Sequence, residues 1–350
     1  MILSKMILEG DAKKRAAAQE LIKTELGITF VKDTFQRLLA QELNLMRVTA
    51  PLFVKAGTGI NDDLNGVERP VSFSVRADGA TQAVIVHSLA KWKRMTLARY
   101  NIPVGAGIYA DMNAIRADED LDAIHSLYVD QWDWERVIRA EDRTIDFLKT
   151  IVRSIYSVVY KVAQAVAHEF NEQPIDLPAE ITFIHAQELE DRYPTFSPKE
   201  RENAACKQHG AVFIIGIGGV LLSGKPHDGR SCDYDDWSTP TGDGFCGLNG
   251  DILVWNAALQ SAFELSSMGI RVDKVALERQ LALHGQQVRA SLLFHRMLLA
   301  GELPLSIGGG IGQSRLCMLY LKKTHIGQVQ ASIWPEAMVK DLHDKGILLL

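Results

Sequence analysis

The sequence predicts an α+β protein with a mainly antiparallel sheet flanked by helices. Segments of alternating apolar and polar residues occur as neighbouring pairs, as residues 71–75 and 83–87 do on either side of Gly79. Helical segments are interspersed among these hairpins without the regular strand–helix–strand rhythm of a parallel, doubly wound sheet. The chain has 350 residues, 47% of them hydrophobic, which is enough to bury one large core.

The N-terminal segments have the spacing of helices. Apolar residues recur at intervals of three and four over residues 11–26 and again over residues 31–45, so we expect two helices there. We interpret residues 1–27 as a helical arm and residues 28–350 as a single domain that holds every motif described below. The second helix leads into a short predicted strand containing Pro51. Because proline has no N–H to donate, it belongs at a sheet edge or an interface.

The later elements follow from the same two periodicities. Residues 142–169 have the pattern of a long amphipathic helix. Further strands are expected at residues 181–185, 211–217, 251–255 and 263–272, and further helices at residues 274–283 and 288–299.

A glycine-rich block near the C-terminus leads into a helix. It contains Gly308, Gly309, Gly310 and Gly312, and Arg315 follows in the first helical turn. A glycine-rich loop lets backbone N–H groups approach a phosphate closely, and an early arginine adds a fixed cation. The block therefore predicts a nucleotide site, with a plain turn before a packed helix as the alternative.

One predicted strand carries hydrogen-bonding side chains on one face. Strand alternation places Gln131, Asp133 and Glu135 together, with Trp132 and Trp134 on the opposite face. Burying three such polar groups is costly unless a polar ligand meets them. This strand is therefore expected to line a ligand site.

Three other blocks add charged groups. The loop 57–64 contains Asp62 and Asp63, whose carboxylates suit an ammonium group. Residues 87–94 follow a strand and are basic; taken alone, they are typical of an exposed helical turn. Asp251 and Glu264 lie on neighbouring predicted strands, an arrangement that suits Mg²⁺ bound with phosphate.

Composition excludes several classes of protein. The formal net charge is -5, which argues against unspecific binding to nucleic acid. No stretch approaches the roughly 20 apolar residues of a membrane span, and the first residues lack the pattern of a signal peptide. The four cysteines lack the paired spacing of a zinc site or a disulfide framework. We therefore expect a cytoplasmic enzyme that binds neither nucleic acid nor membrane.

The motifs resemble a known family. Arg116-x-Asp-Glu-Asp, the Gln-x-Asp-x-Glu strand, Glu264 with Arg271, and the glycine block before Arg315 resemble the catalytic core of class II aminoacyl-tRNA synthetases, closest to the aspartyl and asparaginyl enzymes. The segments HSLAKWKR, YVDQWDWERV, DYDDWSTP, LNGDILVW, FELSSMGIRV and GGGIGQSRL are more similar to the aspartate–ammonia ligase family. This resemblance covers most of the chain from about Phe30 onward and implies a class II synthetase-like core.

The resemblance implies a two-step reaction. Aspartate and ATP would give β-aspartyl-AMP and pyrophosphate, and ammonia would then release AMP and form asparagine. By matching motifs, Arg116 is expected at the α-phosphate, Glu119 near the adenine amino group and Arg315 at the adenine or distal phosphates. Asp235 and Gly310 are expected in the same nucleotide site, although composition alone would make the loop around Asp235 a solvated acidic turn. Asp251 and Glu264 would hold Mg²⁺.

The resemblance also assigns the aspartate site. Lys93 and Arg271 are expected to bind the α-carboxylate of aspartate, and the amino group would face Asp62. The residues expected beside these are Gln131, Asp133, Ser88 and Ser267. Either Asp62 or Asp133 would take a proton from ammonium, and the sequence leaves that choice open.

Partners and alternatives follow from the same comparison. Position 2 is Ile2 rather than a cysteine that could hydrolyse glutamine, so ammonia is the expected nitrogen donor, and glutamine as a second donor stays open. The element around Pro51 resembles the dimer-forming motif of the synthetases and implies a homodimer. The main alternative activity is an aspartyl- or asparaginyl-tRNA ligase. A non-catalytic relative is not expected, because Arg116, Glu264 and Arg315 are all present.

Overall fold

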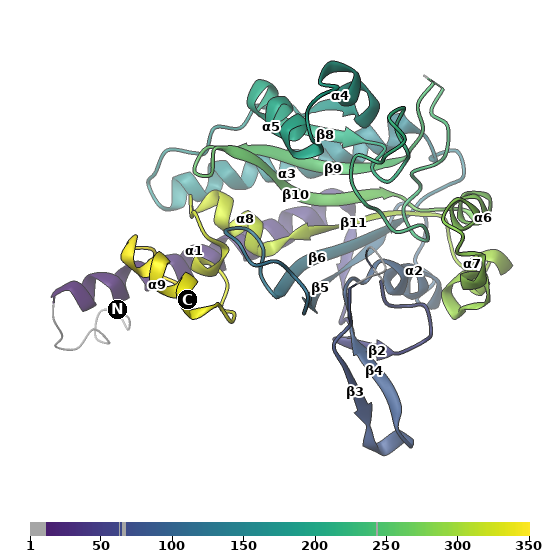
Figure 1. Ribbon diagram of the computed structural model, residues 1–350, viewed down its shortest axis with the longest axis horizontal. Helices are drawn as coiled ribbons and strands as arrows, with labels where there is room; N and C mark the ends of the chain where they lie inside the picture. The colour runs from purple at the N-terminus through teal and green to yellow at the C-terminus, as the bar shows by residue number, and fades with distance from the viewer. Residues whose placement is uncertain (1–11, 63, 65–67, 243) are drawn as a thin grey trace.

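The predicted α+β architecture is confirmed. The computed structural model describes residues 12–62, 64, 68–242 and 244–350 (Figure 1). Its main sheet has eight strands, all antiparallel to their neighbours except the parallel edge pairs β1–β5 and β7–β8. In spatial order the strands are β1 (Leu45–Arg47), β5 (Gly107–Ile115), β6 (Tyr128–Val137), β11 (Ser306–Gly312), β10 (Ser261–Ile270), β9 (Asn249–Asn256), β8 (Ala211–Ile215) and β7 (Thr182–His185).

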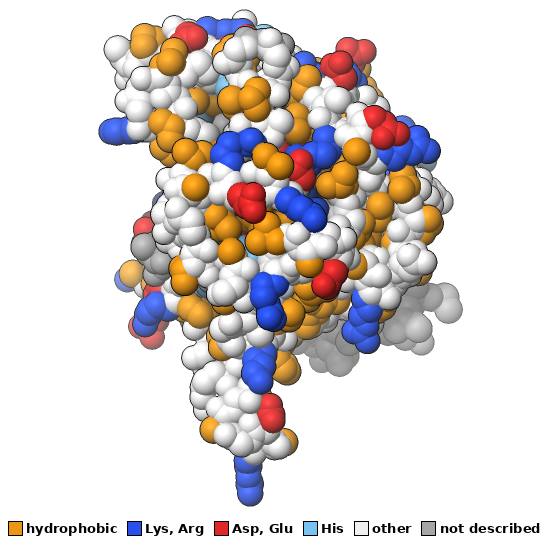
Figure 2. Space-filling view, turned by 90° about the vertical axis from the view of Figure 1, so that its right-hand side faces the viewer, with side chains coloured by type: hydrophobic (Ala, Val, Ile, Leu, Met, Phe, Trp, Pro, Cys, Tyr) orange, Lys and Arg blue, Asp and Glu red, His pale blue; other side chains and the backbone are white. Residues whose placement is uncertain are grey.

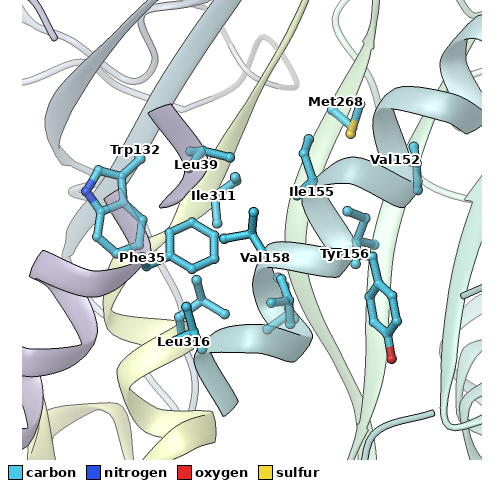
Figure 3. Packing of buried hydrophobic residues seen from close by; sticks show 14 of the residues in the cluster. Phe35, Leu39, Trp132, Val152, Ile155, Tyr156, Val158, Met268, Ile311 and Leu316 are labelled. Atoms are coloured by element: carbon cyan, nitrogen blue, oxygen red, sulfur yellow. The ribbon is translucent and has the colours of Figure 1, made fainter. Parts of the chain in front are cut away.

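One face of the sheet is covered by three helices: α1 (Ala12–Leu43), α3 (Ile145–Glu169) and α8 (Gln313–Tyr320). In Figure 3, Phe35 of α1 lies against Trp132 of β6, and their stacked ring centroids are 4.8 Å apart. Val158, Ile311 and Leu316 pack around the same rings in one large apolar cluster. The two tryptophans of β6 therefore point into the core, which leaves the opposite face of that strand for polar groups, as predicted.

The N-terminal helix differs from expectation. The structure has one continuous α1 instead of two helices, and the predicted boundary between arm and domain at residue 27 falls inside it. Gly27 does not end the helix because the helix packs there closely on Leu321, whose Cδ2 would lie 2.7 Å from an added Cβ. Residues 1–11 of the predicted arm lie outside the described residues, so the arm stays a prediction.

The other face of the sheet carries helices at two ends. At one end, α2 (Ala90–Arg99) packs on β5 and β6. At the other end, α4 (Ala186–Arg192) and α5 (Pro198–His209) pack near β7, β8 and β9, and Ser197 caps α5 through a reciprocal pair of bonds with Glu200. The sheet between these two ends is left uncovered by helices, and this is where the predicted site residues lie.

The smaller elements complete the chain. The helix expected at residues 288–299 is divided at Leu292, which is extended, into η3 (Gln287–Ser291) and α7 (Leu293–Ala300). The remaining helices are α6 (Lys274–Leu283), α9 (Glu336–Asp344), η2 (Arg76–Asp78) and η4 (Ile326–Gln328). In the described part of the chain, no helix is both long and apolar enough to cross a bilayer.

A second sheet projects from the body. It contains β2 (Phe53–Lys55), β3 (Ser72–Val75) and β4 (Thr81–Ile85), and Figures 1 and 2 show it extending away from the main sheet. The predicted strand around Pro51 is divided, because β1 ends at Arg47 and β2 begins after the proline. Pro51 therefore lies between two short strands instead of within one.

The glycine block is a strand, not the loop that was predicted. Gly308, Gly309, Gly310 and Gly312 belong to β11, which pairs with β6 on one side and β10 on the other before α8 begins. Glycine is a poor strand former, so its composition suggested a loop. Its role here is steric: an added Cβ on Gly310 would lie 2.7 Å from Oδ1 of Asp133 and would collide with Gln131.

Candidate active site

A cavity of about 540 Å³ lies on the sheet face between α2 and α5. Nearly all the predicted site residues line it: Asp62, Ser88, Lys93, Arg116, Glu119, Gln131, Asp133, Asp235, Glu264, Ser267, Arg271, Gly310 and Arg315. The exception is Asp251, which is buried behind Arg230, a cavity-lining residue that pairs with it. Residues predicted from separate motifs are thus brought into one site, and Asp63 lies outside the described residues.

Strand register explains how these motifs meet. Asp133 of β6 pairs with Gly310 of β11, Gly310 with Ser267 of β10, and Ser267 with Asp251 of β9. These positions form one row across four strands, and three strand spacings place its ends about 14 Å apart. A site of that length has room for an amino acid at one end and phosphates at the other.

A buried ion-pair network forms the floor at the β6 end. Arg271 donates through Nη2 to Oε2 of Glu135 at 2.9 Å and through Nη1 to Asp235. Glu135 also accepts a 2.7 Å hydrogen bond from Oγ of Ser306. The prediction that a ligand would meet Glu135 is therefore wrong, because the protein supplies its partners. Gln131 and Asp133 remain on the cavity wall.

The charged groups of this network keep one another ionised. Burial opposes the charge on Glu135, but Arg271 and Lys93 outweigh that effect and hold the pKa of Glu135 below its ordinary value. Burial likewise opposes the charge on Arg271, but Glu135 and Asp235 outweigh it, so the pKa of Arg271 is raised. Both partners are therefore charged, and removing either would leave a buried charge without its counterion.

Lys93 reaches the site from α2. Its Nζ donates to the backbone oxygen of Gly309 at 2.9 Å and lies 3.5 Å from Oδ1 of Asp133. Burial lowers the pKa of Lys93, and the carboxylate of Asp133 opposes that shift. Asp133 is held in turn by the backbone N–H of Leu89 at 3.0 Å. Lys93, predicted at the α-carboxylate of aspartate, thus lies beside Asp133 on the cavity wall.

Asp62 is held by neutral donors. The hydroxyls of Ser88 and Tyr234 each donate to its Oδ2 at 3.0 Å, and the N–H of Leu64 donates to Oδ1 at 3.0 Å. The residue is only 1% exposed, and no cation within the described chain forms an ion pair with it. A buried carboxylate without a counterion is unfavourable, so this position suits a cationic ligand group.

Tyr234 is a site residue that sequence reasoning missed. Besides its bond to Asp62, its ring lies 5.6 Å from the guanidinium carbon of Arg271, and burial raises the pKa of its hydroxyl well above the ordinary value. The DYDDWSTP segment contains it, but the only site residue predicted in that segment was the acidic Asp235. A tyrosine beside them was the available signal.

The other end of the cavity holds loosely paired cations. Nη1 of Arg116 lies 3.8 Å from Oε2 of Glu119, and Nη1 of Arg315 lies 3.8 Å from Oε2 of Glu264. Burial opposes the charge on Glu264, but Arg315 outweighs this together with Lys199, Arg230 and Arg116, and the pKa of Glu264 is lowered. Arg315, Lys199, Arg230 and Arg116 all line the cavity, so this end can meet a negatively charged ligand.

The candidate metal ligands adjoin these cations. Asp251 and Glu264 lie on the paired strands β9 and β10, and each affects the ionisation of the other. Burial, against the opposing effect of Arg230, raises the pKa of Asp251 to about 7, and Glu264 adds to the shift. Two carboxylates fit Mg²⁺ when phosphates and waters complete its shell. Over the described residues, no cluster of three or more His, Cys, Asp or Glu forms a self-sufficient metal site.

Asp130, which sequence reasoning also missed, holds the start of α8. It accepts hydrogen bonds from the N–H of Ser314 at 3.0 Å, from Oγ of Ser314 at 2.6 Å and from Nζ of Lys32 at 2.9 Å. Arg315 is the next residue along the helix. Asp130 therefore positions the arginine predicted at the nucleotide.

Comparisons with known proteins give the family. A family model described as aspartate–ammonia ligase matches residues 22–346. The chain is 58% identical over 334 residues to the aspartate–ammonia ligase of Parabacteroides distasonis, covering 95% of this chain and 97% of that protein. It is 53% identical over 348 residues to the aspartate–ammonia ligase of Clostridium perfringens, covering 99% of this chain and all of that protein.

Solved structures with the same fold are synthetases. Asparaginyl-tRNA synthetase from Pyrococcus horikoshii, complexed with asparaginyl-adenylate, aligns with a TM-score of 0.66 at 15% identity over 89% of this chain and 70% of that one. Aspartyl-tRNA synthetase from Entamoeba histolytica aligns with a TM-score of 0.57 at 14% identity over 93% of this chain and 63% of that one. The likeness confirms the class II synthetase-like core. The family model and the close relatives together show that the chain belongs to the aspartate–ammonia ligase family.

Proposed function

We propose that the chain makes L-asparagine from L-aspartate, ammonia and ATP through β-aspartyl-AMP, releasing AMP and pyrophosphate. The observation that carries this proposal is the division of charge within one cavity. Asp62, a buried carboxylate held by neutral donors, lies at one end, and the cavity wall toward Glu264 carries Arg315, Arg116, Arg230 and Lys199. A ligand with an ammonium group at one end and phosphates at the other matches both.

Aspartate would be bound by its α-carboxylate at Lys93 and Arg271. Both side chains are already held by neighbours, so they lose little freedom on binding. The amino group would then face Asp62, with Ser88, Gln131 and Ser267 on the surrounding wall. This orientation directs the side-chain carboxylate of aspartate toward Arg116.

Activation needs the negative charge of the phosphates to be neutralised. Arg116 would lie at the α-phosphate, Arg315 at the adenine or distal phosphates and Glu119 near the adenine amino group, with Asp235 and Gly310 lining the same cavity. Asp251 and Glu264 would hold Mg²⁺, which, when bound, neutralises phosphate charge. Preorganised cations of this kind favour the charge that develops as the side-chain carboxylate attacks phosphorus.

In the second step, ammonium must lose a proton before nitrogen attacks the acyl carbon. Asp62 and Asp133 are the two candidate bases. Asp133 lies 3.5 Å from the ammonium group of Lys93, and Asp62, whose donors within the protein are neutral, would face the amino group of aspartate, so each candidate has one cation beside it. One proton of ammonium would move to the carboxylate that acts as the base, and the nitrogen of ammonia would bond to the acyl carbon. AMP would leave with the electrons of the broken bond between that carbon and the phosphate oxygen, and the second proton on nitrogen would pass to the leaving phosphate or to water.

Several parts of the proposal rest on the sequence alone. A homodimer, a cytoplasmic location, no binding of nucleic acid or membrane, and ammonia in preference to glutamine stay predictions. The alternative of a tRNA ligase is not favoured, because the relatives at 53–58% identity are named aspartate–ammonia ligase while the synthetases share the fold at 14–15% identity.

The test is an assay with ATP, Mg²⁺ and aspartate to which ammonium, glutamine or tRNA is added separately. We expect asparagine and AMP in equal amounts with ammonium. AMP formed only with tRNA would overturn the proposal. Asp62→Asn and Asp133→Asn are compared to identify the base: the variant that lacks it should retain aspartate-dependent exchange of pyrophosphate into ATP and lose asparagine formation. A Lys93→Ala variant with unchanged KM for aspartate would reject the α-carboxylate assignment.

A further inference from the structure

Arg230 is a buried cation in the site to which neither the motifs nor the proposed mechanism gives a role. Its side chain is 11% exposed, lines the cavity and pairs through Nη2 with Asp251. Its Nε lies 3.6 Å from Oδ2 of Asp235, and this buried nitrogen has no hydrogen-bond partner among the residues described. A guanidinium group has five N–H donors, so much of its capacity for hydrogen bonding is unused.

The partner of Arg230 is also a candidate metal ligand. Asp251 and Glu264 are the carboxylates proposed to hold Mg²⁺. A guanidinium group and a divalent cation repel each other strongly at contact distance in a partly dry site. Asp251 could bind a metal through its other oxygen, but the guanidinium paired with it would weaken that binding.

The surroundings provide another place for the guanidinium. Arg230 is one of the four cations that act on Glu264, together with Lys199, Arg315 and Arg116, and all four line the cavity. Planar guanidinium groups match phosphate oxygens well. Since Arg230 lines this cavity, a phosphate bound there would offer its guanidinium group a partner other than Asp251.

The loop that contains Arg230 is anchored to the sheet further along the chain. The same loop continues to Tyr234 and Asp236, which pair with the strand end beside them: the N–H of Asp236 donates to Ile270 at 3.0 Å, and the N–H of Val272 donates to Tyr234 at 2.9 Å.

We infer that Arg230 pairs with Asp251 in the enzyme without ligands. When a divalent cation binds to Asp251, Arg230 pairs instead with the phosphates of ATP or pyrophosphate. The inference rests on the proposed function, in which Asp251 and Glu264 hold the metal. Arg230 is then a phosphate-binding residue that competes with Mg²⁺ at Asp251. Loss of Arg230 should therefore strengthen the binding of a divalent cation and weaken the binding of pyrophosphate.

The first measurement is a titration with Mn²⁺, followed by electron paramagnetic resonance, on protein without nucleotide. Arg230→Gln should bind Mn²⁺ about tenfold more tightly than the wild type, since it removes a unit charge next to a ligand. Lys199→Gln is the matched control: it removes one positive charge from the same cavity and lacks the contact with Asp251. We expect its Mn²⁺ affinity to stay within about threefold of the wild type, because Lys199 is largely exposed.

The second measurement is calorimetric binding of pyrophosphate at saturating Mn²⁺. Arg230→Gln should bind pyrophosphate about tenfold more weakly, as expected when a charge-assisted pair is lost. If Arg230 only stabilised the structure of the site, Arg230→Gln would bind both Mn²⁺ and pyrophosphate more weakly than the wild type. Mn²⁺ affinity in Arg230→Gln that is equal to or below the wild-type value, or no detectable Mn²⁺ binding by either protein, would overturn the inference. Asparagine formation by the wild type tests the proposed function separately.

Discussion

The two ends of the cavity are built in different ways. Around Glu135 and Arg271, the charged side chains are almost fully buried and pair with one another in the empty protein. Around Glu264, the side chains of Arg116 and Arg315 are about a quarter exposed and lie 3.8 Å from their nearest carboxylate oxygens. We call these the aspartate end and the nucleotide end.

The difference shows how much of each end is part of the folded core. The aspartate end lies over the central strands β6, β11 and β10, so its charges must be paired for the sheet to form at all. At the nucleotide end, Arg116 and Arg315 are about a quarter exposed, so water helps to solvate their charge. Changes at the aspartate end should therefore affect both stability and activity, and changes at the nucleotide end should affect activity alone.

The largest effect is expected for Arg271→Met. The change leaves Glu135 and Asp235 buried without their main counterion, and breaking such a pair costs about 3–5 kcal/mol of unfolding free energy. Urea denaturation measures this loss. Arg271→Lys is the control, because it keeps the charge and should recover part of the stability. If the unfolding free energy of Arg271→Met were within about 1 kcal/mol of the wild-type value, the effect would be no larger than that of a typical surface substitution. The aspartate end would then not be part of the core.

Arg116→Gln should separate activity from stability. Removing a preorganised cation at a reacting phosphate typically lowers kcat by about 10²–10³. The side chain is 28% exposed and only loosely paired, so the unfolding free energy should change by about 0.5 kcal/mol or less. Aspartate-dependent exchange of pyrophosphate into ATP reports the first quantity, and urea denaturation reports the second. If Arg116→Gln lost several kcal/mol of unfolding free energy, the two ends would not differ in their contribution to stability.

Two glycines on one strand sharpen the comparison further. An alanine at Gly310 would crowd Gln131 and Asp133, and overpacking of this kind costs about 1–3 kcal/mol. We expect Gly310→Ala to raise the KM for aspartate more than the KM for ATP. Gly312→Ala is the matched control on β11, because its nearest neighbour would be the flexible Arg315, with Cβ atoms 3.3 Å apart. Equal effects of the two changes on KM for aspartate would contradict the assignment.

The smallest effect concerns acid stability. The pKa of Glu135 is held below its ordinary value of 4.5, so its charge stabilises the fold fully above that pH and progressively less as pH falls through the lowered pKa. The Glu135→Gln variant lacks this charge at every pH, so it has no such contribution to lose as the pH falls. We expect the variant to be less stable than the wild type at pH 7, by about 1–3 kcal/mol. The gap should narrow below pH 4.5 in denaturation curves measured at successive pH values, and a constant gap would exclude this role.

Sequence reasoning succeeded where short-range pattern decides structure. Alternation along β6 placed Trp132 in the core and Asp133 on the site face, and both are found there. It failed for the glycine block and for Gly27, because glycine suggests a break while close packing against Leu321 and against the side chains of β6 keeps a helix and a strand continuous. Arg230 and Tyr234 were missed because their partners lie on distant segments.

By itself, the sequence indicated the α+β class, because that depends on residue type and local spacing. Its resemblance to a known family indicated thirteen of the residues that line the cavity. Only the tertiary structure decided which charges are already paired. Glu135 binds Arg271 across 136 positions of sequence, and Asp62 meets Tyr234 across 172. Ion pairing falls steeply with distance and depends on burial, and neither quantity exists until the strands are placed in register.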